Sequence, residues 1–233
     1  MFKERLRSIL GGSAPVPAGA ERQAAAPGAK RPAGSSDAPF HRQSPGLDQF
    51  FSGIRDTLGL SLLDFAGASQ ANISYITGLG HRIYSEDVVR TLGTVFGQGG
   101  EDFYESQARP ELISEFLAQT LDFSDGQFDG ALIWDSFQFM HPALLAAVIG
   151  RLRSILRPNA YLLAFFHADE RAVEVPSYSY RIVDNRSLQL SRRGSRPASL
   201  FFNNRALERL FQDFESVKFF LTRDSLREVI VKR

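Results

Sequence analysis

Residues 60–87, LSLLDFAGASQANISYITGLGHRIYSED, constrain the fold of this chain most strongly. An apolar run that ends near Asp64 leads into four small residues, and a helical pattern follows. The apolar positions of that helix recur at a spacing of three: Ile73, Ile76 and Leu79. Two glycines end the helix, and a second short run, residues 81–85, leads to Asp87. The stretch therefore predicts strand, turn, helix, turn and strand within about thirty residues, a βαβ unit.

The polar and small residues of this unit stand where a parallel sheet binds ligands. Small side chains after the first strand let a ligand approach the backbone closely. The N–H groups at the start of the following helix favour a negative group. Glu86 and Asp87 come about twenty residues after the turn, where a nucleotide site places its ribose ligand. The sequence therefore predicts a nucleotide-type site at the end of the first two strands.

The rest of the chain continues the alternation of strands and helices. The other predicted helices cover residues 47–58, 87–96, 111–121, 142–156 and 204–214. The other predicted strands cover residues 131–134, 161–166, 217–221 and 227–231, with a short hairpin at 180–183 and 187–190. Such alternation predicts a mainly parallel sheet covered by helices on both faces. The last two strands are joined by so few residues that we expect them to be antiparallel.

Residues 1–46 differ in composition from the rest. Residues 11–45 are rich in Ala, Pro, Gly and Ser and contain almost no large apolar residue, so they cannot bury enough surface to fold. We therefore expect a disordered tail over 1–46 and a folded domain over 47–233. Residues 1–10, MFKERLRSIL, have the pattern of a short amphipathic helix, although a helix of that length is marginal in water.

Composition excludes several classes of site. The chain contains no Cys, so disulfides, thiolate metal sites and Cys nucleophiles are excluded. Its 4 His residues are too widely spaced to form a local metal motif. A net charge of +1 gives no global field for nucleic acid or an anionic membrane. The apolar runs are too short to span a bilayer, and a cytoplasmic location is the expectation.

The order of elements and five short motifs resemble class I S-adenosylmethionine-dependent methyltransferases. The resemblance covers roughly residues 47–233. The motifs, in chain order, are LLDFAGASQ, GHRIYSED, LDFSDGQFDGALIWD, LRSILRPNAYLLAFF and FFLTRDSLREVIVKR. Each motif alone is weakly specific, but five in this order are typical of the fold. The resemblance implies a mainly parallel, seven-stranded Rossmann-like sheet with an antiparallel last strand and helices on both faces.

The resemblance also implies S-adenosylmethionine as the cofactor and assigns residues to it. Those that would line the methionine tail are Ala66, Gly67 and Ala68. Asp64 would lie behind this loop and orient it, or meet the ammonium group through water. Asp87, or its neighbour Glu86, would accept hydrogen bonds from the ribose hydroxyls.

Further along the chain, the resemblance places Asp122 and Phe123 at the adenine edge. Trp134 and Asp135 would end the fourth strand and face the methyl group or its acceptor. As candidate catalytic residues, Asp135 and His167 could take a proton from the acceptor. No metal ligand is predicted.

The loop departs from the family pattern of three glycines at alternate positions. Those positions hold Ala66, Ala68 and Gln70, and the only glycine of the loop is Gly67. If one of the three positions requires a positive φ, alanine there costs about 1–2 kcal/mol. Either the loop follows another path, with Gly67 as its flexible point and with polar contacts from Ser69, Gln70 and Asn72, or the cofactor site is degraded and the fold serves as a binding or structural module.

The acidic and aromatic residues also have purely structural readings. Asp64 and Asp87 could cap helices. Asp122 lies in a turn, where Asp is common in any protein. Trp134 could belong to the core. These readings stay open beside the cofactor assignments.

Methyl transfer to a small molecule or a protein is the function that the sequence favours. No Asn-Pro-Pro-Tyr-like motif follows the fourth strand, where Trp134-Asp135-Ser136-Phe137 stands, so a nucleic-acid acceptor is not expected. The first alternative is a catalytically inactive methyltransferase-like interaction module. The second is a nicotinamide-dependent oxidoreductase, which the missing G-x-G-x-x-G motif disfavours. The sequence does not predict the oligomeric state.

Overall fold

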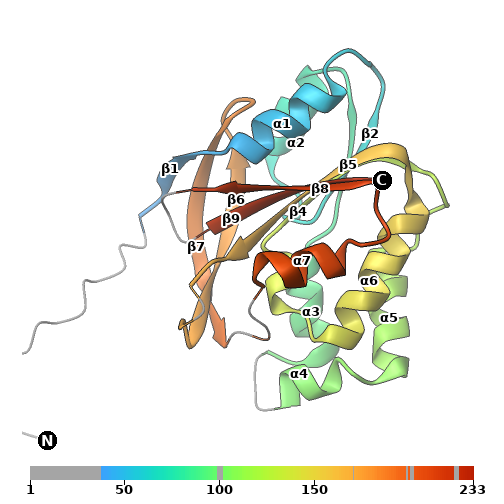
Figure 1. Cartoon of the computed structure of the whole chain (residues 1–233), viewed down its shortest axis with the longest axis vertical. Coiled ribbons are helices and arrows are strands. Elements are labelled where there is room, and N and C mark those ends of the chain that lie inside the picture. The colour runs from blue at the N-terminus through green and yellow to red at the C-terminus, as the bar shows by residue number, and fades with distance from the viewer. Residues whose placement is uncertain (1–37, 99–101, 170, 198, 200–201, 223–225) are drawn as a thin grey trace, which may run out of the picture. The chain divides into compact units, whose positions relative to one another are not determined.

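The computed structural model describes residues 38–233, except 99–101, 170, 198, 200–201 and 223–225. The predicted N-terminal helix and nearly all of the predicted tail lie outside these residues. The described part contains a six-stranded sheet, a three-stranded sheet and the helices that cover the larger one (Figure 1).

The six-stranded sheet has the order β3-β2-β4-β5-β9-β8. Its strands are β2 (Ser61–Asp64), β3 (Arg82–Ser85), β4 (Phe128–Trp134), β5 (Leu156–His167), β8 (Ser216–Leu221) and β9 (Leu226–Lys232). β3, β2, β4 and β5 are parallel, whereas β9 runs antiparallel to both β5 and β8. The predicted parallel sheet with an antiparallel closing pair is confirmed. The predicted strand number was wrong, because this sheet has six strands in the described residues.

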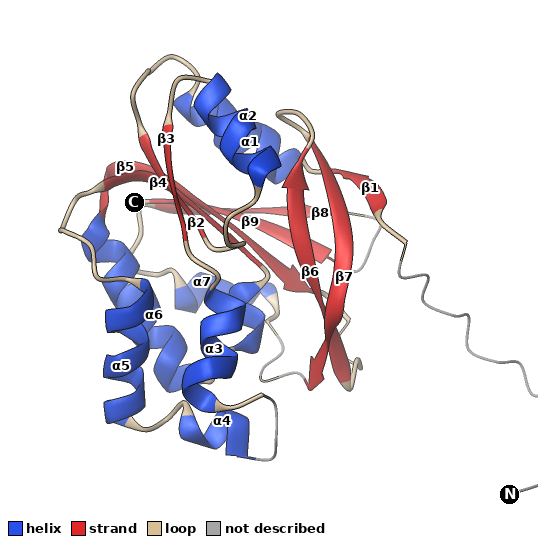
Figure 2. Cartoon of the chain, turned by 180° about the vertical axis from the view of Figure 1, so that it is seen from behind, coloured by secondary structure: helices blue, strands red, loops and turns tan. Residues whose placement is uncertain are grey.

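Helices cover both faces of this sheet. They are α1 (Pro45–Ile54), α2 (Gln70–Gly78), α3 (Val88–Phe96), α4 (Asp102–Ser106), α5 (Pro110–Thr120), a 3-10 turn (Ser136–Phe139), α6 (Pro142–Ile155) and α7 (Asn204–Leu210). α1 and α2 lie on one face, and α3, α5, α6 and α7 lie on the other (Figure 2). Proline starts α1, α5 and α6, where its missing N–H costs nothing. No helix in the described ranges is long and apolar enough to cross a membrane.

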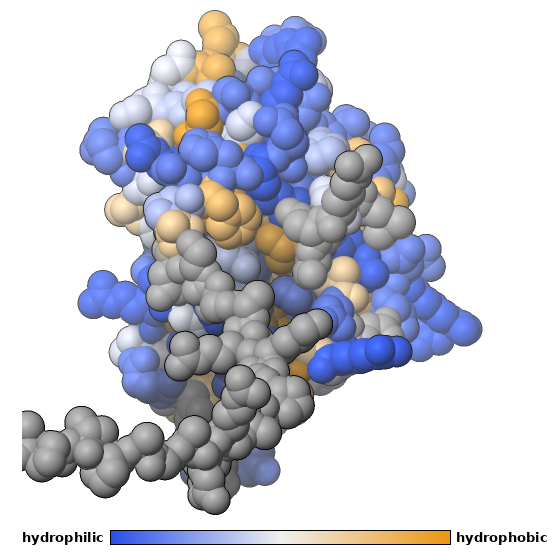
Figure 3. Space-filling model, turned by 90° about the vertical axis from the view of Figure 1, so that its left-hand side faces the viewer, coloured by the Kyte–Doolittle hydropathy of each residue, from blue (hydrophilic) through white to orange (hydrophobic). Residues whose placement is uncertain are grey.

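The three-stranded sheet was only partly predicted. It has the order β1-β7-β6 and consists of β1 (Phe40–Gln43), β6 (Glu174–Ile182) and β7 (Ser187–Pro197), all antiparallel. The predicted short hairpin corresponds to the parts of β6 and β7 next to the turn that joins them. β1 lies inside the segment assigned to the tail, because its sequence FHRQ offers no apolar run. Seen from the side of this sheet, hydrophilic side chains predominate and the visible apolar ones form small groups (Figure 3).

A buried ion pair joins the two sheets. On β1, Arg42 Nη2 lies 2.5 Å from Glu228 Oε1 on β9, and both side chains are almost fully buried. The second oxygen, Glu228 Oε2, accepts hydrogen bonds from Ser44 Oγ at 2.9 Å and from Gly46 N at 2.6 Å. The guanidinium also lies 5.3 Å from the ring centroid of Phe165. One carboxylate therefore fixes β1, the start of α1 and β9 together.

Candidate ligand site at the carboxyl ends of the strands

The chain reverses its direction across the sheet beside β2. The next strand, β3, pairs with one edge of β2, and β4 pairs with the other. In open α/β sheets, ligands bind at such a switch point, outside the carboxyl ends of the strands. Here those ends carry Asp64 on β2 and Trp134 on β4, two residues that the sequence analysis named. The candidate site is therefore built around them.

Asp64 is fully buried and both its carboxylate oxygens are occupied. Its Oδ1 accepts hydrogen bonds from Trp134 Nε1 at 2.6 Å and from Ala66 N at 3.0 Å. Its Oδ2 accepts one from Asn72 Nδ2 at 3.2 Å. Burial raises the pKa of Asp64, and these donors partly oppose the rise. Asp64 therefore connects the small-residue loop, the indole and the first turn of α2 through hydrogen bonds.

Trp134 and Tyr180 fill the space between the two sheets at the switch point. Their ring centroids are 4.8 Å apart and their planes differ by 10°, a stacked pair. Trp134 has φ of 55°, a left-handed conformation that is rare for a bulky residue. The side chain of Asn72 fixes Tyr180 from the other side, because its Nδ2 donates to Tyr180 O and its Oδ1 accepts from Ile182 N. Strand β6 therefore covers the carboxyl ends of β2 and β4.

A pocket of about 390 Å³, here called the loop pocket, remains beside this stack. Its lining residues are Ala66, Gly67, Ala68, Ser69, Asp87, Ser179, Tyr180, Arg181, Gln189, Ser191 and Arg193. Gly67 has φ of +79°, and a Cβ there would lie 3.0 Å from Asp87 Cβ. The loop therefore uses Gly67 as its flexible point. Ser69 precedes α2 without a side-chain cap, which leaves the first-turn N–H groups of α2 uncapped by that residue.

Asp87 lines the loop pocket, and its carboxylate has two partners within the protein. Its Oδ1 accepts a hydrogen bond from Arg90 N at 3.1 Å, which makes Asp87 the N-cap of α3. Its Oδ2 lies 3.0 Å from Nη2 of Arg193, with both side chains about one-third exposed. The neighbouring Glu86 takes part through its backbone, since its carbonyl accepts from Gly67 N at 3.2 Å. Of the two predicted ribose ligands, the carboxylate of Asp87 lines the pocket.

Asp135 follows Trp134 and is almost fully buried. Burial raises its pKa to about 7, although the hydrogen bond from Tyr178 N to Oδ2, at 3.1 Å, and the charge of Arg193 oppose the rise. The rings of Tyr178 and Tyr180 come from β6 of the smaller sheet. A carboxyl group with a pKa near neutrality is typical of a proton-transfer site, but β6 covers this one.

The raised pKa of Asp135 predicts a pH dependence of stability. Below the pKa of the unfolded state, near 3.8, Asp135 is protonated in both states. Between that pH and about 7 the unfolded state has released the proton while the folded state still holds it, which favours unfolding. The free energy of unfolding should therefore fall between about pH 4 and 7. Replacement Asp135→Asn should flatten this slope in urea titrations at several pH values. If the free energy of unfolding of Asp135→Asn fell as steeply with pH as that of the original protein, the raised pKa of Asp135 would be contradicted.

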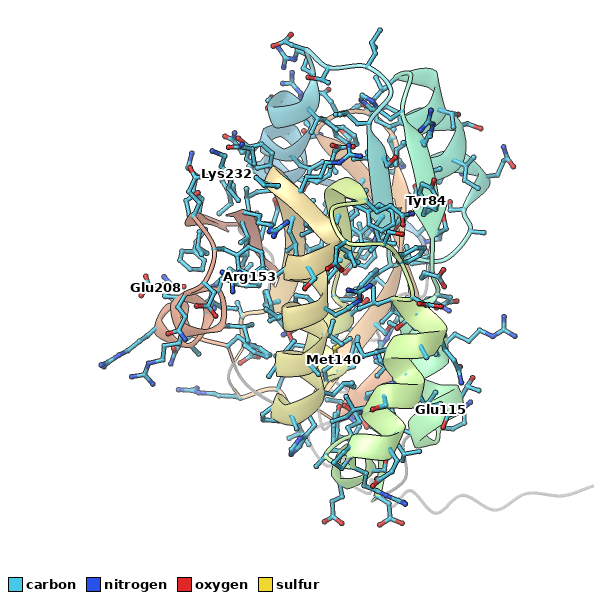
Figure 4. The ribbon with its side chains drawn as sticks, turned by 90° about the vertical axis from the view of Figure 1, so that its right-hand side faces the viewer. Tyr84, Glu115, Met140, Arg153, Glu208 and Lys232 are labelled. Atoms are coloured by element: carbon cyan, nitrogen blue, oxygen red, sulfur yellow. The ribbon has the colours of Figure 1, made fainter. Side chains whose placement is uncertain are left out.

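Two predicted site residues, Asp122 and Phe123, lie away from this group. The ring of Phe123 packs 4.9 Å from that of Phe128, the first residue of β4, and near Tyr84, which Figure 4 labels. Phe123 and its neighbour Asp122 are thus at the amino end of β4, whereas Trp134 is at its carboxyl end. His167 ends β5 at the same carboxyl edge of the sheet as Trp134, does not line the loop pocket, and has its pKa lowered by burial.

Tyr180 and Arg193 are two residues of the site that the sequence analysis did not assign. They belong to β6 and β7, whose contact with the main sheet is not visible from local sequence. Asn72, which was named with Ser69 and Gln70 for the alternative path of the loop, is buried and contacts both Asp64 and Tyr180. In the described part of the chain, no group of three acidic or His side chains could hold a metal ion.

The order and direction of the strands define a mainly parallel, Rossmann-like sheet with an antiparallel closing pair, with one strand fewer than predicted. No sequence model of a known protein family matches the chain, and no curated protein matches it. Solved structures that it resembles are described as methyltransferases.

Three of these structures illustrate the likeness. The 1,6-didemethyltoxoflavin-N1-methyltransferase of Burkholderia thailandensis, with 1,6-didemethyltoxoflavin and S-adenosylhomocysteine bound, is 14% identical over 81% of this chain and 76% of its own, with a TM-score of 0.44. A methyltransferase of Methanosarcina mazei is 14% identical over 76% and 93%, with a TM-score of 0.45. The glycopeptide N-methyltransferase MtfA is 13% identical over 81% and 90%, with a TM-score of 0.40. Because these sequence identities and TM-scores are low, the description of the fold rests on the order and direction of the strands alone.

Proposed function

We propose that this chain binds S-adenosylmethionine in the loop pocket and transfers its methyl group to a small-molecule or protein acceptor. The observation that carries the proposal is the loop pocket itself. It combines a loop of small residues, the uncapped start of α2 and the carboxylate of Asp87 at the switch point. Its volume, about 390 Å³, lies in the range of small-molecule sites. The proposal places the protein in the cytoplasm.

The residues of the pocket suit the polar ends of this cofactor. The first-turn N–H groups of α2 would donate to its carboxylate, and Gly67 lets the loop approach its tail. The carboxylate of Asp87 would accept from the ribose hydroxyls once Arg193 releases it. When bound, the cofactor supplies a methyl group on a positive sulfonium, so the protein mainly aligns the acceptor.

Proton removal from the acceptor is assigned to Asp135, with His167 as the second candidate. A pKa of about 7 suits a general base at neutral pH. Tyr178 and Tyr180 cover Asp135, so an acceptor reaches this carboxylate only if the hairpin of β6 and β7 moves away. The proposal thus includes an opening of this hairpin during each turnover.

The competing candidate is a methyltransferase-like module that binds partners without catalysis. Two observations favour it: the Trp134–Tyr180 stack fills the switch point, and Arg193 already neutralises Asp87. Isothermal titration calorimetry with S-adenosylmethionine and S-adenosylhomocysteine separates the two candidates. Saturable binding of either ligand supports the cofactor site. Absence of heat and of a thermal shift at about millimolar ligand would leave the module as the remaining function.

The ribose assignment predicts the effect of replacing Asp87. Asp87→Asn keeps an N-cap for α3 but removes the charge, and it should weaken binding of S-adenosylhomocysteine at least about tenfold. Calorimetry measures the change in dissociation constant. Asp56→Ala, at an exposed position after α1, is the control and should leave affinity unchanged. Equal affinities of Asp87→Asn and the original protein would refute the assignment.

A further inference from the structure

A second pocket, here called the arginine pocket, lies next to the loop pocket and has no role in the proposed function. Its volume is about 330 Å³. The residues that line it are Val89, Arg90, Gln98, Ser177, Arg193, Gly194, Ser195 and Arg196. Arg193 lines both pockets, and it stands between them. Three guanidinium groups are present among these lining residues. Asp87 pairs with Arg193 and Glu174 accepts a hydrogen bond from Ser195 Oγ, so the positive groups still outnumber the adjacent carboxylates.

Two polar groups of the arginine pocket are buried without a hydrogen-bond partner. Ser177 is only 4% exposed, and its Oγ has no partner in the described residues. The Nη1 atom of Arg196 is also buried without one, while its guanidinium lies 4.8 Å from the ring centroid of Phe103. A buried polar group without a partner costs about 1–3 kcal/mol. Both groups therefore have unused hydrogen-bonding capacity that a ligand in this pocket could satisfy.

The backbone of β7 directs Arg193 toward this region. The ladder pairs Tyr178 with Arg192 and Ser177 with Gly194, so Arg193 is an extra residue on β7. A bulge of this kind bends the strand and turns a side chain to a new direction, and it is frequent next to functional sites. Here it places the guanidinium beside Asp87 on one side and the arginine pocket on the other. Arg193 can therefore exchange a carboxylate of the protein for a negative group of a ligand.

We propose that the arginine pocket binds the phosphate or carboxylate group of a small anionic molecule. Arg90, Arg193 and Arg196 supply planar donors that match such groups, and Ser177 Oγ–H supplies a neutral one. Charge-assisted hydrogen bonds of this kind are the strongest that proteins form. The inference does not depend on methyl transfer, because the anion is recognised by residues outside the loop.

Calorimetric titration of the full chain at low salt tests the proposal, with inorganic phosphate in one series and acetate in the other. Saturable binding of phosphate, acetate or both, with a dissociation constant of about millimolar or lower, is the expected result. The two series distinguish phosphate from carboxylate ligands. Arg196→Gln and Ser177→Ala should each weaken the binding, the former about tenfold or more because it removes a charged donor. If Arg196→Gln does not fold, Arg90→Gln replaces it in the test, because Arg90 also lines the pocket and its side chain is exposed. It should weaken the binding as well.

Arg153→Gln is the matched control, since Arg153 is an exposed arginine of α6 on the side of α7 (Figure 4). It should retain the affinity of the original protein. Absence of saturable binding to both anions overturns the proposal, and so does an equal loss in Arg153→Gln and the arginine-pocket variants. Failure of S-adenosylhomocysteine to bind has no bearing on this outcome, so the two proposals fail separately.

Discussion

Replacement of Glu228 by Gln should lower the free energy of unfolding by about 3–5 kcal/mol. Glutamine keeps the volume of the side chain but removes the negative charge that faces Arg42, in a place where both side chains are buried. The loss of one partner of a buried ion pair is costly because the other charge stays desolvated. The hydrogen bonds from Ser44 Oγ and Gly46 N to the carboxylate would weaken as well.

Urea denaturation measures this change through the transition midpoint at constant slope. The control is Glu215→Gln, which breaks the exposed ion pair with Lys232 at 2.8 Å, and we expect only a small change from it. The double variant Arg42→Met with Glu228→Leu removes both charges of the pair and should recover part of the loss, because Ser44 Oγ and Gly46 N still lose their acceptor. If Glu228→Gln is as mild as Glu215→Gln, the ion pair does not hold the two sheets together.

The main sheet could be predicted because its parallel strands are buried on both faces and therefore consist of short apolar runs. Such runs mark β2 and β4, and the adjoining helices begin at clear signals, such as Pro142 of α6. β6 and β7 carry no such run, because only one side of each strand packs against the core. The bulge at Arg193 also interrupts their alternation. For these reasons, the sequence predicted the larger sheet and only part of the smaller one.

The candidate site shows the same limit. Asp64, the loop and Asp87 follow one another along a single βαβ unit, so their proximity could be inferred from the sequence. Their partners Tyr180 and Arg193 come from a hairpin more than a hundred residues further on, as the 106-residue separation of Asp87 and Arg193 illustrates. Asp122 and Phe123 were placed by motif order, although a loop that leads directly into β4 must lie at the amino end of that strand, opposite Trp134. Among the residues that line the loop pocket, local pattern thus named Ala66, Gly67, Ala68 and Asp87, and it missed those that come from β6 and β7.

Trp134→Ala should lower the free energy of unfolding by about 3–5 kcal/mol, as expected for removal of a buried aromatic side chain. The indole is 1% exposed and stacks on Tyr180, and its Nε1 donates to the buried carboxylate of Asp64. Trp134→Phe keeps a ring but removes this donor, so a smaller loss of about 1–3 kcal/mol is expected. Urea titrations followed by far-UV circular dichroism measure both, because Trp134 is the only Trp of the chain and cannot report on its own removal by fluorescence.

Leu58→Ala is the control for Trp134, since Leu58 is a large apolar side chain that is 78% exposed, and it should change stability by about 0.5 kcal/mol or less. If Trp134→Ala lowered the free energy of unfolding as little as Leu58→Ala does, the packing of the indole at the switch point would contribute little to stability. Trp134→Ala should retain binding of S-adenosylhomocysteine, because Trp134 does not line the loop pocket. Loss of that binding would show that the stack also shapes the loop pocket.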